Sequence, residues 1–296
     1  MGTGEPTFTI VMPVYNRAAR VDEAIASVAA QTRDDWELWV VDDGSTDGTT
    51  GRIHRWADRD RRIQALHQAN AGPAAARNAG VRRGRAPWLT FLDSDDLYFP
   101  DALERFGAFL DAHPDVFFVY GYRYRMGADG TITYVTGEFQ TRPTDGADLF
   151  GRMFLWHVCV CYRRTLFDAV GGYDERLRFS EDYDLYLRMS RHTTFHPLGA
   201  ATGLRRHLAP RRGRRAGAGR RAEARILKRY LREGRGHDTL DPRRINRRLA
   251  QVYYRGGRDC FRAGRFDRAK RMLAISHHYS PALRTGGLAV ASELLR

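Results

Sequence analysis

The chain has 296 residues, of which 43% are hydrophobic, a length that suits one large α/β domain with an appendage. It has no apolar run of about 18 residues, so no membrane-spanning helix is predicted, and residues 1–7 lack the basic and apolar regions of a signal peptide. Cys159, Cys161 and Cys260 are too few and too unevenly spaced for a disulfide framework or a zinc site, which favours a cytoplasmic protein.

The charge of the chain is unevenly distributed. Residues 203–296 hold 26 Lys and Arg against 7 Asp and Glu, a net charge of +19, whereas residues 1–202 carry a net charge of −5. One interpretation is a catalytic body followed by a basic extension that meets an anionic surface. The other is a solubilising, arginine-rich helical tail. Both stay open at this point.

Strands and helices are predicted to alternate over the first ninety residues. Apolar strands are expected over 8–16, 36–41, 63–67 and 88–92, and helices over 22–30, 48–59 and 74–82. Such alternation predicts a parallel sheet with helices on both faces. Ligands of these sheets bind beyond the carboxyl ends of the strands. Three of those ends carry polar clusters, at residues 15–16, 42–43 and 93–95.

The last of these clusters is the most informative. An apolar run leads directly into Asp93, Ser94, Asp95 and Asp96. Ionised carboxylates are costly in a core, so they are expected at the surface end of the strand, where a divalent cation would relieve their mutual repulsion. Mg²⁺ and Mn²⁺ suit hard oxygen ligands. The alternative is a solvated acidic turn before the helix that begins near Asp101.

The pattern becomes irregular after residue 100. Helices are expected over 101–111, 145–155 and 164–170, strands over 116–125, 131–135 and 158–162, and an extended segment over 193–207. Asp129-Gly130 predicts a hairpin. Ser180 is expected to cap a helix that runs to about residue 192, with Glu181 and Asp182 near its positive end. Further amphipathic helices are predicted over 222–232, 243–261, 266–276 and 282–295.

Five motifs occur in one order along residues 8–207: Pro13-Val14-Tyr15-Asn16, Asp42-Asp43-Gly44-Ser45-Thr46-Asp47, Asn70-Ala71-Gly72 with Ala76-Arg77-Asn78, Asp93-Ser94-Asp95-Asp96, and Gly171-Gly172-Tyr173-Asp174-Glu175 with Glu181-Asp182-Tyr183-Asp184-Leu185. Together they resemble the family 2 glycosyltransferases of the GT-A type. The resemblance implies an α/β fold with a Rossmann-like, mostly parallel sheet flanked by helices. It covers about residues 8–207 and predicts a glycosyltransferase domain over 1–207. The composition and helical spacing of the remaining residues predict an Arg-rich linker over 208–221 and a basic α-helical extension over 222–296.

The resemblance also implies an activity, that of an inverting, metal-dependent hexosyltransferase. The donor would be a nucleotide-diphosphate sugar, with a UDP-sugar favoured, and the acceptor a hydroxyl group of a glycan, a lipid-linked sugar or a small metabolite. Asp182 matches the catalytic base. Asp95 matches a metal ligand for Mg²⁺ or Mn²⁺. His207 either completes this metal site or is an exposed histidine in an Arg-rich loop. The implied nucleotide-sugar-binding residues are Pro13, Tyr15, Asn16, Asp42, Asp43, Asn70, Gly72, Arg77, Asp93 and Ser94.

Further expectations concern the acceptor site and the partners of the protein. Trp156 and Glu181 are candidate acceptor-binding residues, with a core position as the alternative for the tryptophan. A non-catalytic sugar-nucleotide-binding scaffold is the alternative to an enzyme. No nucleic-acid partner is expected, because no recognised module accompanies the basic third. That third predicts peripheral contact with an anionic membrane, at its inner face.

Overall fold

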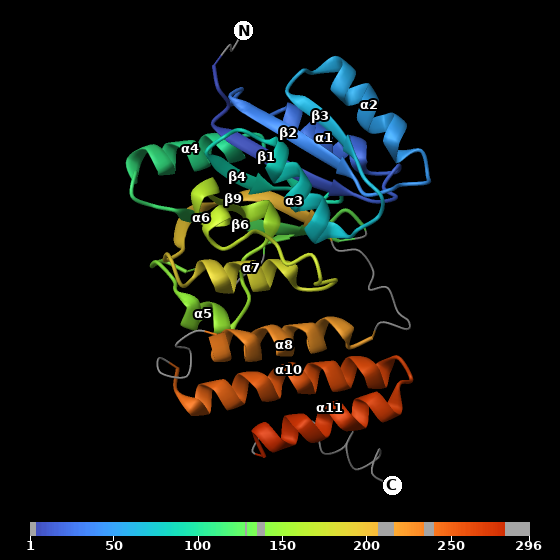
Figure 1. The fold of residues 1–296 in the computed structure, drawn as a ribbon, viewed down its shortest axis with the longest axis vertical. Helices are drawn as coiled ribbons and strands as arrows, with labels where there is room; N and C mark the ends of the chain where they lie inside the picture. Colours follow the sequence, from blue (N-terminus) through green and yellow to red (C-terminus); the bar gives the residue numbers. More distant parts are fainter. Residues whose placement is uncertain (1–3, 128, 135–139, 207–215, 234–239, 282–296) are drawn as a thin grey trace. The chain divides into compact units, whose positions relative to one another are not determined.

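The structure is a computed structural model, and it describes residues 4–127, 129–134, 140–206, 216–233 and 240–281 (Figure 1). Two compact units make up the chain. The first combines Met1–Asp145 with Phe154–Ala209, and the second combines Gly146–Met153 with Pro210–Arg296. His207 and the predicted helix over 282–295 lie outside the described residues.

The first unit begins with the predicted alternation of strands and helices. Its strands pair in the order β3-β2-β1-β4, all parallel, which confirms the parallel sheet. The elements of this part are β1 (Phe8–Val14), α1 (Val21–Ala29), β2 (Trp36–Asp42), α2 (Thr49–Arg59), β3 (Ile63–His67), α3 (Pro73–Arg83) and β4 (Trp88–Phe91).

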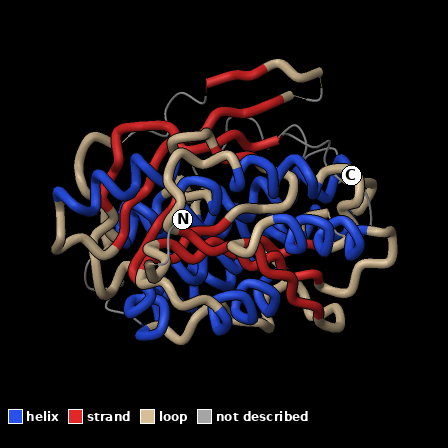
Figure 2. Tube along the Cα trace, turned by 90° about the horizontal axis from the view of Figure 1, so that it is seen from above, coloured by secondary structure: helices blue, strands red, loops and turns tan. Residues whose placement is uncertain are grey.

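The sheet continues with mixed strand directions. β8 is antiparallel to β4 and β6, β9 is parallel to β6, and β5 and β7 pair antiparallel with β9 and β6. Figure 2 shows in red how the strands twist relative to one another. The elements are β5 (Leu97–Tyr98), α4 (Ala102–Ala112), β6 (Phe118–Met126), β7 (Ile132–Tyr134), η1 (His157–Cys159), β8 (Val160–Arg163), α6 (Arg164–Ala169), α7 (Glu181–Met189) and β9 (His196–Arg206).

The hairpin predicted around Asp129-Gly130 is confirmed by the pairing of β6 with β7. The strand expected over 158–162 differs from the structure, because it begins as the 3₁₀ turn η1 and becomes extended only at Val160. The structure also contains β5, a strand of two residues that was not predicted. A strand of two residues has no periodicity that a sequence pattern can report.

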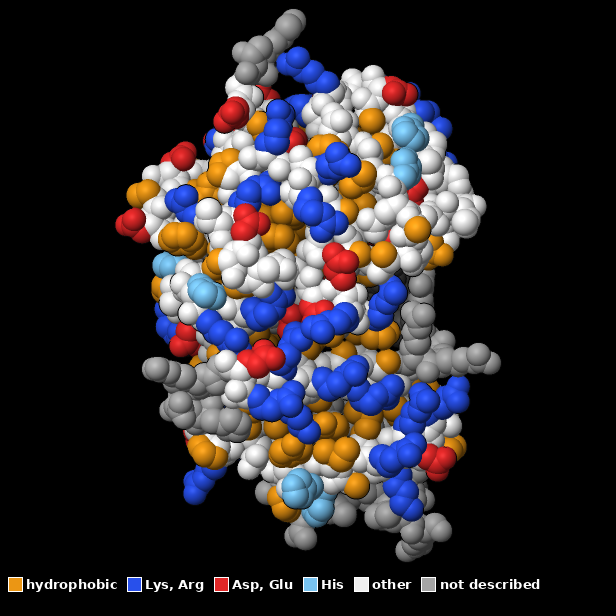
Figure 3. All heavy atoms as spheres, viewed as in Figure 1, with side chains coloured by type: hydrophobic (Ala, Val, Ile, Leu, Met, Phe, Trp, Pro, Cys, Tyr) orange, Lys and Arg blue, Asp and Glu red, His pale blue; other side chains and the backbone are white. Residues whose placement is uncertain are grey.

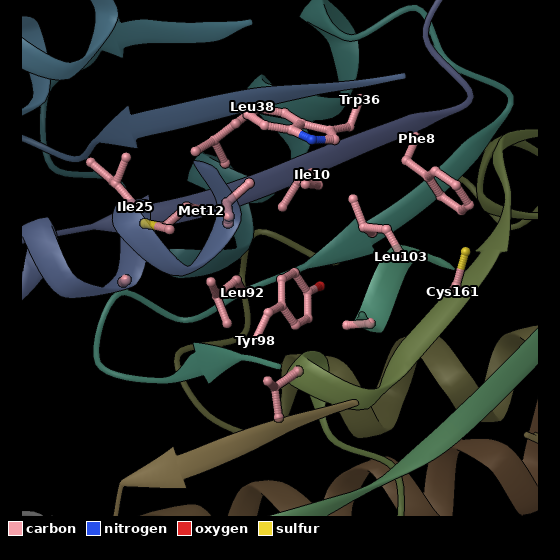
Figure 4. Close-up of a cluster of buried hydrophobic side chains, with 14 of the residues drawn as sticks. Phe8, Ile10, Met12, Ile25, Trp36, Leu38, Leu92, Tyr98, Leu103 and Cys161 are labelled. Atoms are coloured by element: carbon pink, nitrogen blue, oxygen red, sulfur yellow. The ribbon is translucent and has the colours of Figure 1, made fainter. Parts of the chain in front are cut away.

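The core lies on both faces of the parallel strands. Successive side chains of a strand point to opposite faces, and Phe8, Ile10 and Met12 pack with Ile25 of α1 and Leu103 of α4 (Figure 4). The other face of β1 is covered by the small residues of α3. A Cβ at Gly80 would lie 2.4 Å from Val11 Cγ1. This close approach packs α3 tightly against β1. Arg77, on the same helix, reaches Asp93 at the carboxyl end of β4.

The second unit is helical, with α5 (Gly146–Gly151), α8 (Ala218–Glu233), α10 (Pro242–Arg262) and α11 (Phe266–Tyr279). The start of α8 lies four residues before the predicted helix, within the segment expected to be a linker. Asp241 caps α10, because its side chain accepts from the backbone N–H of Arg243 over 2.9 Å. Inside the unit, Arg248 Nη2 pairs with Glu223 Oε1 at 2.6 Å. No helix among the described residues is long and apolar enough to cross a membrane.

Candidate active site

The loop that follows β1 is held by the loop that follows β2. Asn16 has a left-handed backbone with φ 52°, which asparagine tolerates better than most residues. Its N–H donates to Ser45 Oγ over 2.9 Å, and its Oδ1 accepts from the N–H of Thr46 over 2.8 Å. Pro13 is partly buried in β1, whereas Tyr15 is 47% exposed. The ring of Tyr15 is therefore accessible for stacking.

Asp42 shapes the turn after β2. Its Oδ1 accepts from the N–H of Ser45 over 2.9 Å, and its Oδ2 accepts from the hydroxyl of Thr50. Burial raises the pKa of Asp42, but the hydrogen bonds from Ser45 and Thr50 outweigh burial and bring this pKa below its ordinary value. The ionised carboxylate is thus part of the turn itself.

Asp43 holds the loop that precedes α3. Its Oδ1 accepts from Gln68 Nε2 and from the N–H of Ala71, and its Oδ2 accepts from the N–H of Gly72, each over 2.8 Å. Asn70 Nδ2 donates to the Asp43 carbonyl over 2.9 Å. A carboxylate offers about four acceptor positions, so these three bonds leave one position of Asp43 unused by these partners.

Gly72 occupies a position that only glycine fits. Its φ is 98°, and a Cβ there would lie 2.5 Å from Arg178 Nη1. The Arg178 guanidinium lies over this loop because Nη1 donates to the Ala71 carbonyl over 2.9 Å. Pro73 then begins α3. Arg178 was not among the residues predicted from the sequence.

Arg77 lies on the buried side of α3 and bridges two acids. Its Nη2 donates to Asp93 Oδ1 over 2.6 Å, and its Nη1 donates to Glu181 Oε1 over 2.8 Å. Burial lowers the pKa of Arg77, but Asp93 and Glu181 raise it well above its ordinary value. Arg77 therefore joins the end of β4 to the first turn of α7. Its role as a nucleotide-sugar-binding residue stays a prediction.

The acidic turn after β4 contains like charges at close range. Burial and the neighbouring Asp93 raise the pKa of Asp95, whose carboxylate lies 3.6 Å from Arg17 Nη2. Burial, Asp93 and Asp95 raise the pKa of Asp96 further. Ser94 is buried within the turn. The turn is thus a set of carboxylates whose repulsion is only partly offset by a protein cation.

This turn fits a divalent cation that is held largely by the substrate. In the described part of the chain, no three His, Cys, Asp or Glu side chains converge as a metal site. Mg²⁺ is commonly held by one or two carboxylates together with substrate phosphates and water. Asp95, with 22% of its side chain exposed, fits such a ligand, whereas the second predicted ligand, His207, is outside the described residues.

Asp182 lies in the first turn of α7. Ser180 occupies the N-cap position with φ 58°, but its side chain makes no capping hydrogen bond. Asp182 Oδ1 accepts from the N–H of Tyr183 over 2.8 Å. Burial raises the pKa of Asp182, His157 lowers it and Glu181 raises it, and the net effect is a raised pKa. A carboxylate with a raised pKa is a stronger base.

One cavity of about 300 Å³ brings several predicted residues together. Its lining includes Asp93 from the end of β4, Arg77 from α3, Glu181 and Asp182 from α7, and Trp156. The other nucleotide-site residues, which follow β1 and β2, form the hydrogen-bonded loops described above. The predicted donor and base residues therefore fall into two groups, one that lines the cavity and one in the loops after β1 and β2.

The two predicted acceptor residues already have partners within the protein. The Trp156 ring has the guanidinium carbons of Arg123 and Arg205 at 4.2 Å from its centroid. Glu181 is paired with Arg77. Both residues line the cavity, but contact with these arginines leaves less of the tryptophan ring for a sugar.

The structure adds a histidine to the site. His157 is buried, with Nε2 3.1 Å from Tyr173 Oη and Nδ1 3.7 Å from Asp93 Oδ2. Tyr173 is fastened to Asn78 by two hydrogen bonds of 2.9 Å between the Asn78 amide and the Tyr173 backbone. Asn78 and Tyr173 belong to the sequence motifs, whereas His157 stands in no pattern that marks it.

Comparison with known proteins agrees with this geometry. Residues 9–171 match the family described as glycosyl transferase family 2. The chain is 31% identical over 187 residues to the uncharacterized glycosyltransferase EpsJ of Bacillus subtilis, an alignment that covers 60% of this chain and 54% of that protein. It is 33% identical over 188 residues to the PGL/p-HBAD biosynthesis glycosyltransferase of Mycobacterium bovis, covering 62% of this chain and 69% of the relative. The chain thus spans about half the length of EpsJ.

Two solved structures have a similar fold. The structure of S. aureus TarS 1–349 in complex with UDP-GlcNAc has a TM-score of 0.64 at 17% identity, covering 95% of this chain and 92% of TarS. The mannosyltransferase PcManGT from Pyrobaculum calidifontis, in complex with GDP-Man and Mn²⁺, has a TM-score of 0.54 at 19% identity, covering 99% of this chain and 79% of the other. These likenesses confirm the predicted GT-A-type α/β fold. Since the family match spans more than half of the chain, the protein belongs to glycosyl transferase family 2.

Proposed function

We propose that this protein is an inverting glycosyltransferase that moves a sugar from a nucleoside-diphosphate donor to a hydroxyl acceptor. The observation that carries the proposal is that Asp182 and Asp93 line one cavity. Their elements are joined by Arg77, which binds Asp93 and Glu181 at the same time. A base and a donor-site carboxylate are therefore held at a defined separation around a space for substrate.

A UDP-sugar is the donor that we favour. The remaining acceptor position on Asp43 suits the ring N–H of uracil, and also that of guanine. Tyr15 offers an exposed ring for the base to stack on. TarS has been solved with UDP-GlcNAc and PcManGT with GDP-Man, so both bases occur among proteins of similar fold. The acceptor that we favour is a glycan, an envelope polysaccharide or a glycolipid, with a small metabolite as the alternative.

The transfer would proceed as a single displacement. The acceptor oxygen attacks the anomeric carbon on the side opposite the diphosphate, and the bond from that carbon to the diphosphate oxygen breaks with its electron pair. The acceptor proton passes to the Asp182 carboxylate, which acts as general base. The anomeric configuration inverts through an oxocarbenium-like transition state, comparable to that of glycoside hydrolysis.

The proposal includes a divalent cation at the acidic turn. Asp95 would hold it, and the cation when bound would neutralise charge on the diphosphate. Burial, followed by the neighbouring carboxylates, raises the pKa values of Asp95 and Asp96, and a bound cation would favour the ionised form of both. Arg17, at 3.6 Å from Asp95, is the protein cation nearest to that carboxylate in the ion pairs of the described residues.

The experiment is a donor screen on the purified chain. A panel of UDP- and GDP-sugars is incubated with Mn²⁺ or Mg²⁺, and released nucleoside diphosphate is measured with and without glycan and glycolipid acceptors. Asp182→Asn should lower turnover by about 10²–10⁴-fold while the affinity for UDP stays unchanged. Asp111→Asn, an exposed aspartate at the end of α4, serves as the matched control. Wild-type turnover in Asp182→Asn contradicts the assignment of the base.

We further propose that the helical unit contacts an anionic membrane. Lys and Arg side chains gather over α8, α10 and α11 in Figure 3. On α11, Arg268, Arg271 and Ile275 are exposed at helical spacing, and Phe266 at its start is 54% exposed. Basic residues beside exposed apolar side chains are the combination that binds a lipid surface.

A further inference from the structure

We propose that His157 is a positioning residue for the base Asp182, held in place by Tyr173 and acting through the network that joins the end of β4 to α7. The inference rests on the proposed function, since it concerns the base of that reaction. It assigns a role to a buried histidine that no motif in the sequence marks.

Two contacts determine how the imidazole ring lies. Nε2 is 3.1 Å from Tyr173 Oη, and Nδ1 is 3.7 Å from Asp93 Oδ2. When the Tyr173 hydroxyl donates to Nε2, Nδ1 carries the proton and faces the carboxylate. Tyr173 is itself tied to Asn78 of α3. The ring is thus supported from the helix that also carries Arg77.

The same ring lies near an aromatic side chain of α7, the helix that carries the base. The His157 ring lies 6.4 Å from the ring of Tyr186, centroid to centroid. Tyr186 follows Asp182 by four residues, and residues at this spacing share one face of a helix. His157 and Asp182 also line the same cavity. The imidazole therefore lies beside the donor-site carboxylate and near the aromatic ring of Tyr186 on the helix of the base.

Asp93 links His157 to Arg77 and, through Arg77, to the first turn of α7. Asp93 is approached by Arg77 at Oδ1, 2.6 Å away, and by His157 at Oδ2. Arg77 also donates a hydrogen bond to Glu181, the residue that precedes Asp182.

Two substitutions separate the two edges of the ring. His157→Asn places an amide near Nδ1 and loses the group at Nε2, whereas His157→Gln places an amide near Nε2 and loses the group that faces Asp93. Turnover of the donor identified in the screen should fall about 10²-fold in His157→Gln, the size of effect that a displacement of about 1 Å has on reacting groups. His157→Asn should retain more turnover than His157→Gln. The affinity for UDP, measured by calorimetry, should stay unchanged in both.

A double-mutant cycle with Asp182→Asn tests whether His157 acts through the base. Residues that act as a unit are strongly non-additive. In the Asp182→Asn background, His157→Gln should therefore change the remaining turnover by less than about threefold. The full loss in that background, or a parallel loss of UDP affinity, overturns the proposal.

A purely structural role for His157 would give a different result. Both His157→Asn and His157→Gln would then lower the unfolding temperature and reduce turnover by the same factor. This result would also overturn the proposal. The proposed function is tested separately by Asp182→Asn alone. Asp182→Asn alone can be impaired while the double variant loses turnover by the product of the two single losses. In that case the proposed function is supported and the role of His157 is rejected.

Discussion

Replacing Arg77 should destabilise the first unit by an amount that can be worked from its contacts. Arg77 is 3% exposed and pairs with two carboxylates. Arg77→Met fills a similar volume but leaves both acids without their cation. Removing one partner of a buried ion pair costs about 3–5 kcal/mol, because the remaining charge stays buried and unpaired.

The two carboxylates should contribute unequally to that cost. The Glu181 side chain is 12% exposed, whereas that of Asp93 is 36% exposed, so water screens the loss at Asp93. The lower end of the range, about 3 kcal/mol, is therefore expected. For a unit of this size, 1 kcal/mol corresponds to about 2–4 °C in unfolding temperature. Arg77→Met should unfold about 6–12 °C below the wild type.

Calorimetry of the full chain measures this shift. Arg82→Met is the matched control, since Arg82 lies on the same helix with a 67% exposed side chain, 3.8 Å from Glu175. Its effect should stay within about 0.5 kcal/mol. The double variant Arg77→Met, Glu181→Gln should recover part of the lost unfolding temperature, because it removes the charge of the more buried of the two carboxylates. A shift of Arg77→Met no larger than that of Arg82→Met would refute the reasoning.

Three other predictions concern the proposed reaction and surface. Asp95→Asn should abolish metal-dependent turnover with an unchanged circular dichroism spectrum; retained turnover with the same metal dependence removes Asp95 from the metal site. The pKa of Asp182 is raised above the ordinary carboxyl value of 3.8, and a general base must be ionised to accept a proton. kcat/KM should therefore fall, as the pH is lowered, with an apparent pKa above 3.8. A fall with an apparent pKa at or below 3.8 contradicts this prediction. The double variant Arg268→Glu, Arg271→Glu should weaken binding of the full chain to anionic vesicles at low salt, by about 1 kcal/mol for each arginine removed, and equal binding by the variant counts against the membrane proposal.

Much of the parallel half of the sheet could be predicted because its signals are local. The strand at Phe8–Val14 is apolar on both faces, and Pro73 and Gly72 mark the start of α3. Polar residues at successive strand ends predict a site at one edge, since parallel strands end at the same edge. The structure brings Asp43 and Asn70 together there as that reasoning requires.

The interactions of the site could not be predicted in the same way. The partners Arg77 and Glu181 are separated by 104 positions in the sequence, and no periodic pattern links residues so far apart. A lone histidine such as His157 has the same appearance in a core as in a site. The sequence also predicts a base at α7, but the influences that set the pKa of Asp182 come from residues folded around it.

The strand order has a consequence for how the protein folds. The strands β3-β2-β1-β4 are neighbours in the sheet and are complete by Phe91, so the emerging chain can assemble this half during synthesis. β5, by contrast, pairs only with β9 among the described strands, about a hundred residues later. Until α7 is made, the guanidinium of Arg77 lacks its Glu181 partner. The parallel half of the sheet can therefore form before α7 is made, and the Arg77–Glu181 ion pair can form only afterwards.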